Sequence, residues 1–282
     1  MSLSNEKIAE LQSEFNLSYH IPYLFAGDDA VSLKGKSILE IGGSLPKKLV
    51  LDILGVQQWI GIEDMRYWDE IGKDGGGTQP TEVYTKPVSD VKSLNDLGSY
   101  SILEGQVEDI PECLENCFDR VFSIACFEHI HTLGLALDKM YAVLKPGGKL
   151  FTMFSPIWSA YDGHHIPNLA DADGREYTKA NSPIPPWGHL LYSPSVMEQH
   201  LQSQTDRITA AKLIYHIYHN PHINRLFTED YVEYVSNSPF EVENFQATFP
   251  AQISQKIQSA LEMRFPGKKH FSNNGILLVL KK

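Results

Sequence analysis

The stretch KSILEIGGSLPKKLVLDILGVQQWIGIED, residues 36–64, decides the fold class of this chain. A short apolar run over 37–41 ends in two glycines, and apolar residues then recur at helical spacing over 49–54 until Gly55. Ser44 followed by Pro46 is typical of a helix start, and Gly55 of a helix end. A second strand is expected over Gln58–Glu63, so the stretch predicts strand, glycine turn, helix and strand.

The same alternation continues along the chain. Short apolar runs predict strands over residues 101–104, 118–126 and 149–154, and a helix over 133–144 ends in the turn of residues 145–148. Strands that alternate with helices at this spacing pair in parallel through right-handed crossovers. The sequence therefore predicts an α/β fold with a doubly wound, mostly parallel sheet.

The segments outside this alternation suggest three parts. Residues 4–15 are expected to form an amphipathic helix, and residues 156–239, rich in Pro, Trp, Tyr and His, are too long for one crossover. Helices are expected after Ser193, over 205–219 and from Thr228, followed by a strand over 240–249, a helix over 253–262 and a strand over 275–280. We expect an N-terminal helical cap (1–35), a core (36–155 and 226–282) and an inserted lid or substrate region (156–225).

The composition indicates which class of partner the protein binds. The chain has 282 residues and a formal net charge of −11, which argues against binding to nucleic acid or to an anionic membrane. It has no apolar run that would span a bilayer and no recognisable secretory signal at its start. The three cysteines are too few for a disulfide framework. We expect a cytoplasmic protein, capable of forming a homodimer, whose partner is a small molecule.

Two acidic residues lie where a ligand is expected. Ligands of open α/β sheets bind at the carboxyl ends of the strands, where Glu63 and Asp64 follow Glu40 by 23 and 24 residues. A carboxylate at this distance can accept two hydrogen bonds from a ribose diol. The turn lacks the G-x-G-x-x-G pattern that cradles a pyrophosphate, which disfavours a nicotinamide or nucleotide-sugar enzyme.

Five segments in order resemble the class I S-adenosylmethionine-dependent methyltransferases of the small-molecule group. They are residues 38–42 (first motif), 59–63 (acidic second-strand motif), 104–111 (adenine loop), 118–130 (fourth-strand motif) and 143–150 (turn into the fifth strand). The resemblance implies a Rossmann-like, seven-stranded sheet with an antiparallel last strand, and S-adenosyl-L-methionine as cofactor. Ser44 and Pro46 stand where the family usually has glycines, and Gln106 where it usually has aspartate.

The resemblance also implies a role for individual residues. Each group binds one part of the cofactor: the methionine end (Glu40, Gly42, Gly43), the ribose hydroxyls (Glu63, Asp64), the adenine (Gln106, Val107) and the methionine moiety with its sulfonium (Ile124, Ala125).

The acceptor side is expected in the inserted region. His164 and His165 follow the fifth strand closely, and a histidine is the natural base near neutral pH, so either is a candidate catalytic base. A satisfied loop histidine is an equally good interpretation. The aromatic side chains predicted to bind substrate are Trp158, Trp187 and His189, which are also candidates for a packed core or a dimer surface.

Metal binding is the less favoured interpretation of the eleven histidines. Pro221 interrupts the spacing of His216, His219 and His222. Asp162 with His164, His165 and His189 is an alternative set for a divalent ion, and no metal is predicted. His129, next to Glu128, is interpreted as a structural hydrogen-bonding residue.

These observations predict an enzyme, an S-adenosylmethionine-dependent transferase. It would methylate an oxygen or nitrogen of a soluble small molecule, such as a glycan precursor or a secondary metabolite. The alternative is a non-catalytic protein of the same fold that uses its lid as a partner-binding surface.

Overall fold

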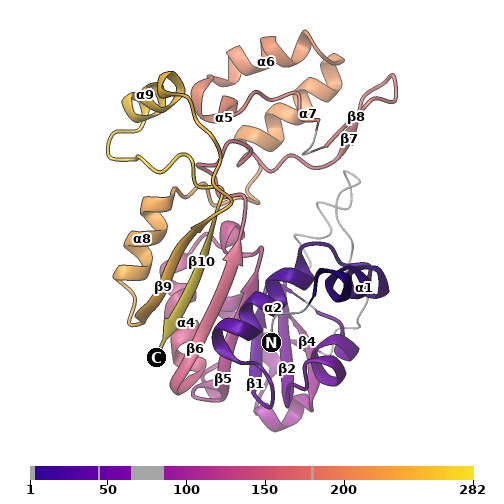
Figure 1. Cartoon of the computed structure of the whole chain (residues 1–282), viewed down its shortest axis with the longest axis vertical. Helices are drawn as coiled ribbons and strands as arrows, with labels where there is room; N and C mark the ends of the chain where they lie inside the picture. Colours follow the sequence, from indigo (N-terminus) through magenta and orange to yellow (C-terminus); the bar gives the residue numbers. More distant parts are fainter. Residues whose placement is uncertain (1–3, 44, 65–85, 179–180) are drawn as a thin grey trace.

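A computed structural model describes residues 4–43, 45–64, 86–178 and 181–282 (Figure 1). Eight strands form one sheet in the order β3-β4-β2-β1-β5-β6-β10-β9. Their bounds are β1 (Ser37–Ile41), β2 (Gln58–Glu63), β3 (Lys86–Pro87), β4 (Tyr100–Glu104), β5 (Phe118–Ile124), β6 (Leu144–Phe154), β9 (Glu241–Thr248) and β10 (Gly275–Lys281). The predicted α/β class is confirmed; the two-residue β3 at one edge makes the sheet eight-stranded instead of seven-stranded.

The direction of the strands follows the expected pattern. The pairs among β1, β2, β3, β4, β5 and β6 are all parallel, whereas β10 lies antiparallel between β6 and β9. The chain moves outward from β1 to β2 and β4, and then returns to place β5 on the other side of β1. The order therefore reverses between β1 and β5, which is where a doubly wound sheet binds its ligand.

Helices cover both faces of the sheet. One face packs against α4 (Leu133–Val143) and α8 (Thr228–Ser236) in a large apolar cluster. The other face packs against α1 (Asn5–Phe15), α2 (His20–Val31) and a π-helical turn (Lys48–Ile53), around Trp59, Phe122 and Phe151. Ser4 caps α1 as expected, since its hydroxyl accepts a hydrogen bond from the Lys7 amide at 3.2 Å.

Helix α2 is an element that the sequence did not predict. Its interior contains Gly27, and glycine is a poor residue for a helix interior. Gly27 allows α2 to lie directly on the sheet: a Cβ atom built there would be 2.5 Å from Cε2 of Phe122 and 2.9 Å from Cδ1 of Phe151. Tertiary packing thus stabilises a helix that local propensity disfavours.

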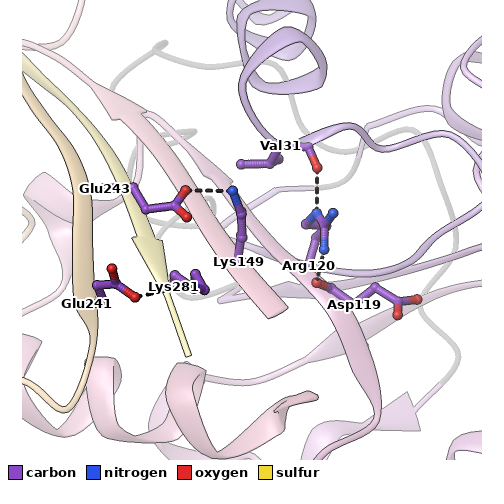
Figure 2. A network of polar contacts seen from close by, with 7 residues as sticks. All are labelled: Val31, Asp119, Arg120, Lys149, Glu241, Glu243 and Lys281. Carbon is purple, nitrogen blue, oxygen red and sulfur yellow. Dashed lines mark hydrogen bonds and ion pairs between the residues drawn. The ribbon is translucent and has the colours of Figure 1, made fainter. Parts of the chain in front are cut away.

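Charged side chains cover the exposed side of the β9–β10 ribbon (Figure 2). Lys149 of β6 pairs with Glu243 of β9 at 2.6 Å, and Lys281 of β10 pairs with Glu241 at 3.0 Å. On β5, the Arg120 guanidinium donates from Nε to the Val31 carbonyl at 2.6 Å, which ties the end of α2 to the sheet. Exposed ion pairs contribute little stability, but charge on an edge strand discourages pairing with another chain.

The inserted region forms a separate layer beyond the carboxyl ends of the strands (Figure 1). It contains the hairpin β7 (Leu169–Ala170) and β8 (Glu176–Tyr177) and the helices α5 (Gly188–Leu191), α6 (Pro194–Gln202) and α7 (Arg207–Tyr218). Helix α9 (Gln255–Arg264), between β9 and β10, packs against α5 in the same layer. Part of the segment 226–282, predicted as core, therefore contributes to this layer. Among the described helices, none combines the length and hydropathy needed to cross a bilayer.

The close approach of α2 to the sheet gives a first prediction. Gly27→Ala improves helix propensity by about 1 kcal/mol. We nevertheless expect a net loss of about 1–3 kcal/mol in the free energy of unfolding, because the added methyl overlaps Phe122 and Phe151. Gly134→Ala in α4 is the control, since its nearest neighbours, Cδ1 and Cε1 of Tyr234, lie at 3.6 Å. Urea unfolding of both variants tests the prediction, and equal behaviour of the two would contradict it.

Candidate functional site

The glycine turn after β1 lies against the loop that follows β5. Gly42 has a φ of +74°, and a Cβ atom built there would overlap the Sγ atom of Cys126. At Gly43 the same atom would overlap Oε1 of Glu40. Only glycine fits these two positions, because Cys126 and Glu40 already occupy the space that a Cβ atom would take. We call the backbone of Gly42 and Gly43 the glycine cradle. Ser44, one of the departures from the family motif, lies outside the described residues.

Glu40 organises this turn from below. Its carboxylate is buried, and Oε2 accepts hydrogen bonds from the Trp59 indole at 2.6 Å and from the Leu45 amide at 3.1 Å. Oε1 has no hydrogen-bond partner among the described residues and lies next to Gly43. Burial raises the pKa of Glu40 from 4.5 to about 7, despite both hydrogen bonds. Glu40 therefore holds the turn in place through Oε2. Its other oxygen, Oε1, is left for a hydrogen-bond donor of a ligand at this turn.

The acidic end of β2 adjoins the loop after β4. Glu63 is buried at the end of β2, and its carbonyl accepts a hydrogen bond from the Gly105 amide at 3.0 Å. Asp64 accepts a second one from the Gln106 side chain at 2.9 Å. Val107 is buried directly beyond Gln106. The residues predicted for ribose and for adenine therefore lie together, although 42 positions separate Asp64 from Gln106 in the sequence.

The end of β5 completes the switch point. Ile124 is buried, and Ala125 has a φ of +49° with its amide donating to the Met153 carbonyl at 3.0 Å. Burial, and after it the carboxylates of Glu128 and Glu63, raise the pKa of the Cys126 thiol well above its ordinary value. Two buried carboxyl groups, those of Glu63 and Glu128, thus adjoin the junction of these loops, an environment that suits a positively charged ligand.

A second group of side chains lies on the far side of Cys126. Glu128, His129 and His165 each offer one ligating atom within 4.8 Å of the others. The His129 ring donates from Nδ1 to the His222 carbonyl at 2.5 Å, as expected for a structural role, and meets the His165 ring edge-on at 5.4 Å. Burial lowers the pKa of His129 to about 4, so this imidazole is neutral at pH 7.

Two tyrosines of α2 and its N-terminus border this group, and sequence analysis did not identify them. Partial burial and then the Glu128 carboxylate raise the pKa of Tyr19 to about 12. Tyr23 lies 3.3 Å, hydroxyl to hydroxyl, from Ser155 after β6, and its ring stacks on Phe249. No local pattern marks these residues, because they reach the site through the packing of an unpredicted helix.

Of the two histidines predicted as bases, the structure brings only His165 to Glu128. His165 is half-buried and its Nδ1 lies 3.1 Å from the Gly163 carbonyl. His164 is 3% exposed and its ring meets that of His189, inside the inserted region.

The three residues predicted to bind substrate also lie in the interior of the inserted region. Trp187 donates from its indole to the Phe271 carbonyl at 3.0 Å, and His189 Nε2 lies 2.8 Å from the Trp158 carbonyl. Trp158, Trp187 and His189 are all less than a tenth exposed. These three residues are packed together in the structure, as in the core alternative that the sequence left open, and their predicted role in substrate binding stays a prediction.

The metal sets considered from sequence do not assemble either. Among the described residues, the group that can converge on a metal ion is Glu128, His129 and His165, and it omits Asp162, His164 and His189. His216 is buried in α7, and its Nδ1 lies 2.9 Å from the Asn220 side-chain amide. A shallow hollow of about 540 Å³ on the outer side of α7 is lined by residues such as Arg207 and Tyr215, far in the fold from the strand ends.

Part of the chain matches a known protein family. Residues 80–152 match the sequence profile of a family described as "Methyltransferase domain". No curated protein matches the chain significantly. An S-adenosylmethionine-dependent methyltransferase from Mesorhizobium loti is similar in structure, with 12% identity, a TM-score of 0.49 and coverage of 95% of this chain and 100% of that one.

Two further solved structures are similar to a comparable degree. A SAM-dependent methyltransferase from Archaeoglobus fulgidus has 13% identity and a TM-score of 0.46, covering 96% of this chain and 98% of that one. Phosphoethanolamine N-methyltransferase 2 from Haemonchus contortus, in complex with S-adenosyl-L-methionine, has 13% identity and a TM-score of 0.43, covering 88% of this chain and 49% of that one.

The raised pKa of Glu40 predicts a pH-dependent stability. Because its folded-state pKa of about 7 exceeds the ordinary 4.5, the folded chain keeps a proton that the unfolded chain releases over this range. The stability that Glu40 contributes at low pH is therefore lost as the pH rises towards 7. Glu40→Gln keeps an oxygen acceptor for Trp59 but cannot ionise. We expect the free energy of unfolding of the variant, minus that of the wild type, to increase between pH 5 and pH 8, by on the order of 2–3 kcal/mol.

Urea unfolding at several pH values measures this difference. The buried histidines with lowered pKa values, His129 and His189, destabilise both proteins equally in acid, so their effect cancels in the comparison. A difference that does not change with pH would contradict the assignment of a protonated Glu40.

Proposed function

We propose that the chain is an S-adenosylmethionine-dependent methyltransferase that acts on an oxygen or nitrogen atom of a soluble small molecule. The match of residues 80–152 to a methyltransferase domain supports this proposal. The observation that carries this proposal is the position of the Glu128–His129–His165 group. It lies beside Cys126, which itself touches the glycine turn after β1. A methyl donor held at that turn would thus be next to side chains able to bind a methyl acceptor. Such proximity supplies much of the rate of a transfer reaction.

The cofactor supplies an activated methyl group on a sulfonium when bound. We assign the methionine part to the turn of Gly42 and Gly43, where the lack of side chains lets a ligand approach the backbone closely. We assign Glu63 and Asp64 to the ribose hydroxyls, and Gln106 with Val107 to the adenine, since Gln106 donates to Asp64 and Val107 is buried next to it in the chain. The buried carboxyl groups of Glu63 and Glu128, which both act on Cys126, favour a positively charged donor.

The acceptor is proposed to bind among Tyr19, Tyr23, Glu128 and His165. Acceptor oxygens generally lose a proton during transfer, and an imidazole is suited to this task near neutral pH. We assign the handling of that proton to His165, since His164 is turned into the core of the inserted region. The inserted region, to which His165 belongs, forms a layer beyond the carboxyl ends of the strands (Figure 1), and we propose that this layer covers a small acceptor.

A cytoplasmic location is part of the proposal. The three cysteines are all free thiols, as expected in a reducing compartment. The net charge of −11 continues to argue against a polyanionic partner.

Ligand-induced stabilisation is the direct test. We expect S-adenosylmethionine and S-adenosylhomocysteine to raise the melting temperature of the chain and NAD to leave it unchanged. A ligand present at 100 times its dissociation constant stabilises the folded state by about 2.7 kcal/mol, which a thermal shift detects readily. If neither adenosyl compound shifts the transition, the proposed function is wrong.

The ribose assignment can be tested with one substitution. Glu63→Gln keeps the size of the side chain but removes the charged acceptor for the ribose hydroxyls. A hydrogen bond to a charged group contributes about 1.5–3 kcal/mol, so S-adenosylhomocysteine should bind roughly 10- to 100-fold more weakly by calorimetry. Asp52→Asn, which removes an exposed carboxylate from the π-helical turn, is the charge-matched control. Equal affinity in a folded Glu63→Gln variant would refute the position assigned to the ribose.

A further inference from the structure

Glu128, His129 and His165 come from two distant parts of the chain and converge beside the switch point. The first two follow β5, and His165 belongs to the inserted region after β6. One ligating atom from each lies within 4.8 Å of the others. Ligands bound to one ion at about 2.0–2.2 Å are themselves roughly 3 to 4 Å apart, so small side-chain rotations would close this set around a metal.

Both histidine rings are held as metal ligands usually are. The Nδ1 atom of His129 lies 2.5 Å from the His222 carbonyl, and that of His165 lies 3.1 Å from the Gly163 carbonyl. A carbonyl can only accept, so each Nδ1 carries the proton and each Nε2 carries the lone pair of the neutral ring. Backbone carbonyls that fix the tautomer and orientation of a histidine in this way are typical of metal sites.

We propose that Glu128, His129 and His165 bind one divalent transition-metal ion at the acceptor side of the cleft. Two imidazoles and one carboxylate are the donor set of catalytic zinc sites and of non-haem iron sites, in which three protein ligands leave a position open. Zn²⁺ is therefore the first ion to test.

This metal site deepens the proposed function, and its role in the reaction rests on that function. An acceptor oxygen that occupies the open position has its pKa lowered by the ion, as a metal-bound water does. His165 then promotes the loss of the acceptor's proton by holding the ion. The proton itself passes to solvent water, because Nε2 of His165 is on the ion and Nδ1 donates to Gly163.

Three conservative substitutions separate metal binding from folding. His165→Asn and His129→Asn each retain a side-chain donor in the place of Nδ1 and remove Nε2. Asparagine also tolerates the left-handed backbone of His165, whose φ is +47°. Glu128→Gln keeps the shape and removes the charge. His219→Ala, an exposed histidine at the end of α7, is the control for adventitious binding.

The experiment measures the zinc content and the zinc affinity of the full chain. After treatment with EDTA and dialysis, the wild type and the control are expected to take up one equivalent of Zn²⁺, measured by elemental analysis and by competition with a chelating dye. Each of the three ligand variants should bind at least 10-fold more weakly. Co²⁺ in place of Zn²⁺ should give visible absorption bands that the three variants lack.

The outcomes distinguish this inference from the proposed function. S-adenosylhomocysteine affinity, measured on the same samples, reports on the donor site alone. If that ligand binds while the wild type takes up no zinc, or if the three variants retain zinc as the wild type does, the metal site is refuted and the proposed function stands. If zinc binds as expected but the adenosyl ligand does not, the proposed function fails instead.

Discussion

The contact between Gly42 and Cys126 is the constraint on which the site depends. It joins the loop after β1 to the loop after β5 so closely that no side chain fits at Gly42. Two parallel strands that lie side by side bring their carboxyl ends together in any such sheet. Here this contact also sets the separation of the glycine cradle from Glu128 and His129, since both follow Cys126 directly.

The inserted region is anchored to the same loop. Asn224, at its end, donates from its side-chain amide to the carbonyls of Phe127 and Ile130 at 2.7 and 3.0 Å, and the His222 carbonyl accepts from His129. The loop that carries Glu128 is thus held from the core on one side and from the insertion on the other. A group positioned from both sides keeps its geometry when a ligand enters, which is what a transfer reaction requires.

The local sequence pattern predicted the helices and strands whose residues favour the structure that they adopt. β2 spans Gln58–Glu63 as expected, α1 begins after Ser4, and α4 ends at Val143, one residue before the expected end. Helix α2 escaped prediction because Gly27 disfavours a helix locally, and packing on Phe122 and Phe151 stabilises it. Cofactor roles could be proposed from sequence for residues at or just after the ends of strands that the pattern marks, and these roles stay predictions, whereas Tyr19 and Tyr23 depend on α2 and carried no pattern.

The sequence by itself determined the alternation of strands and helices, hence the parallel sheet, its switch point and the acidic and glycine-rich strand ends that a methyl donor would use. These follow from short-range spacing, which a linear pattern records. Only the tertiary structure decided which histidine lies next to Glu128: His164 and His165 are neighbours in sequence, but one packs on His189 and the other on His129. Adjacent residues in a turn point in different directions, so the packing partners on each side decide where each histidine ring lies.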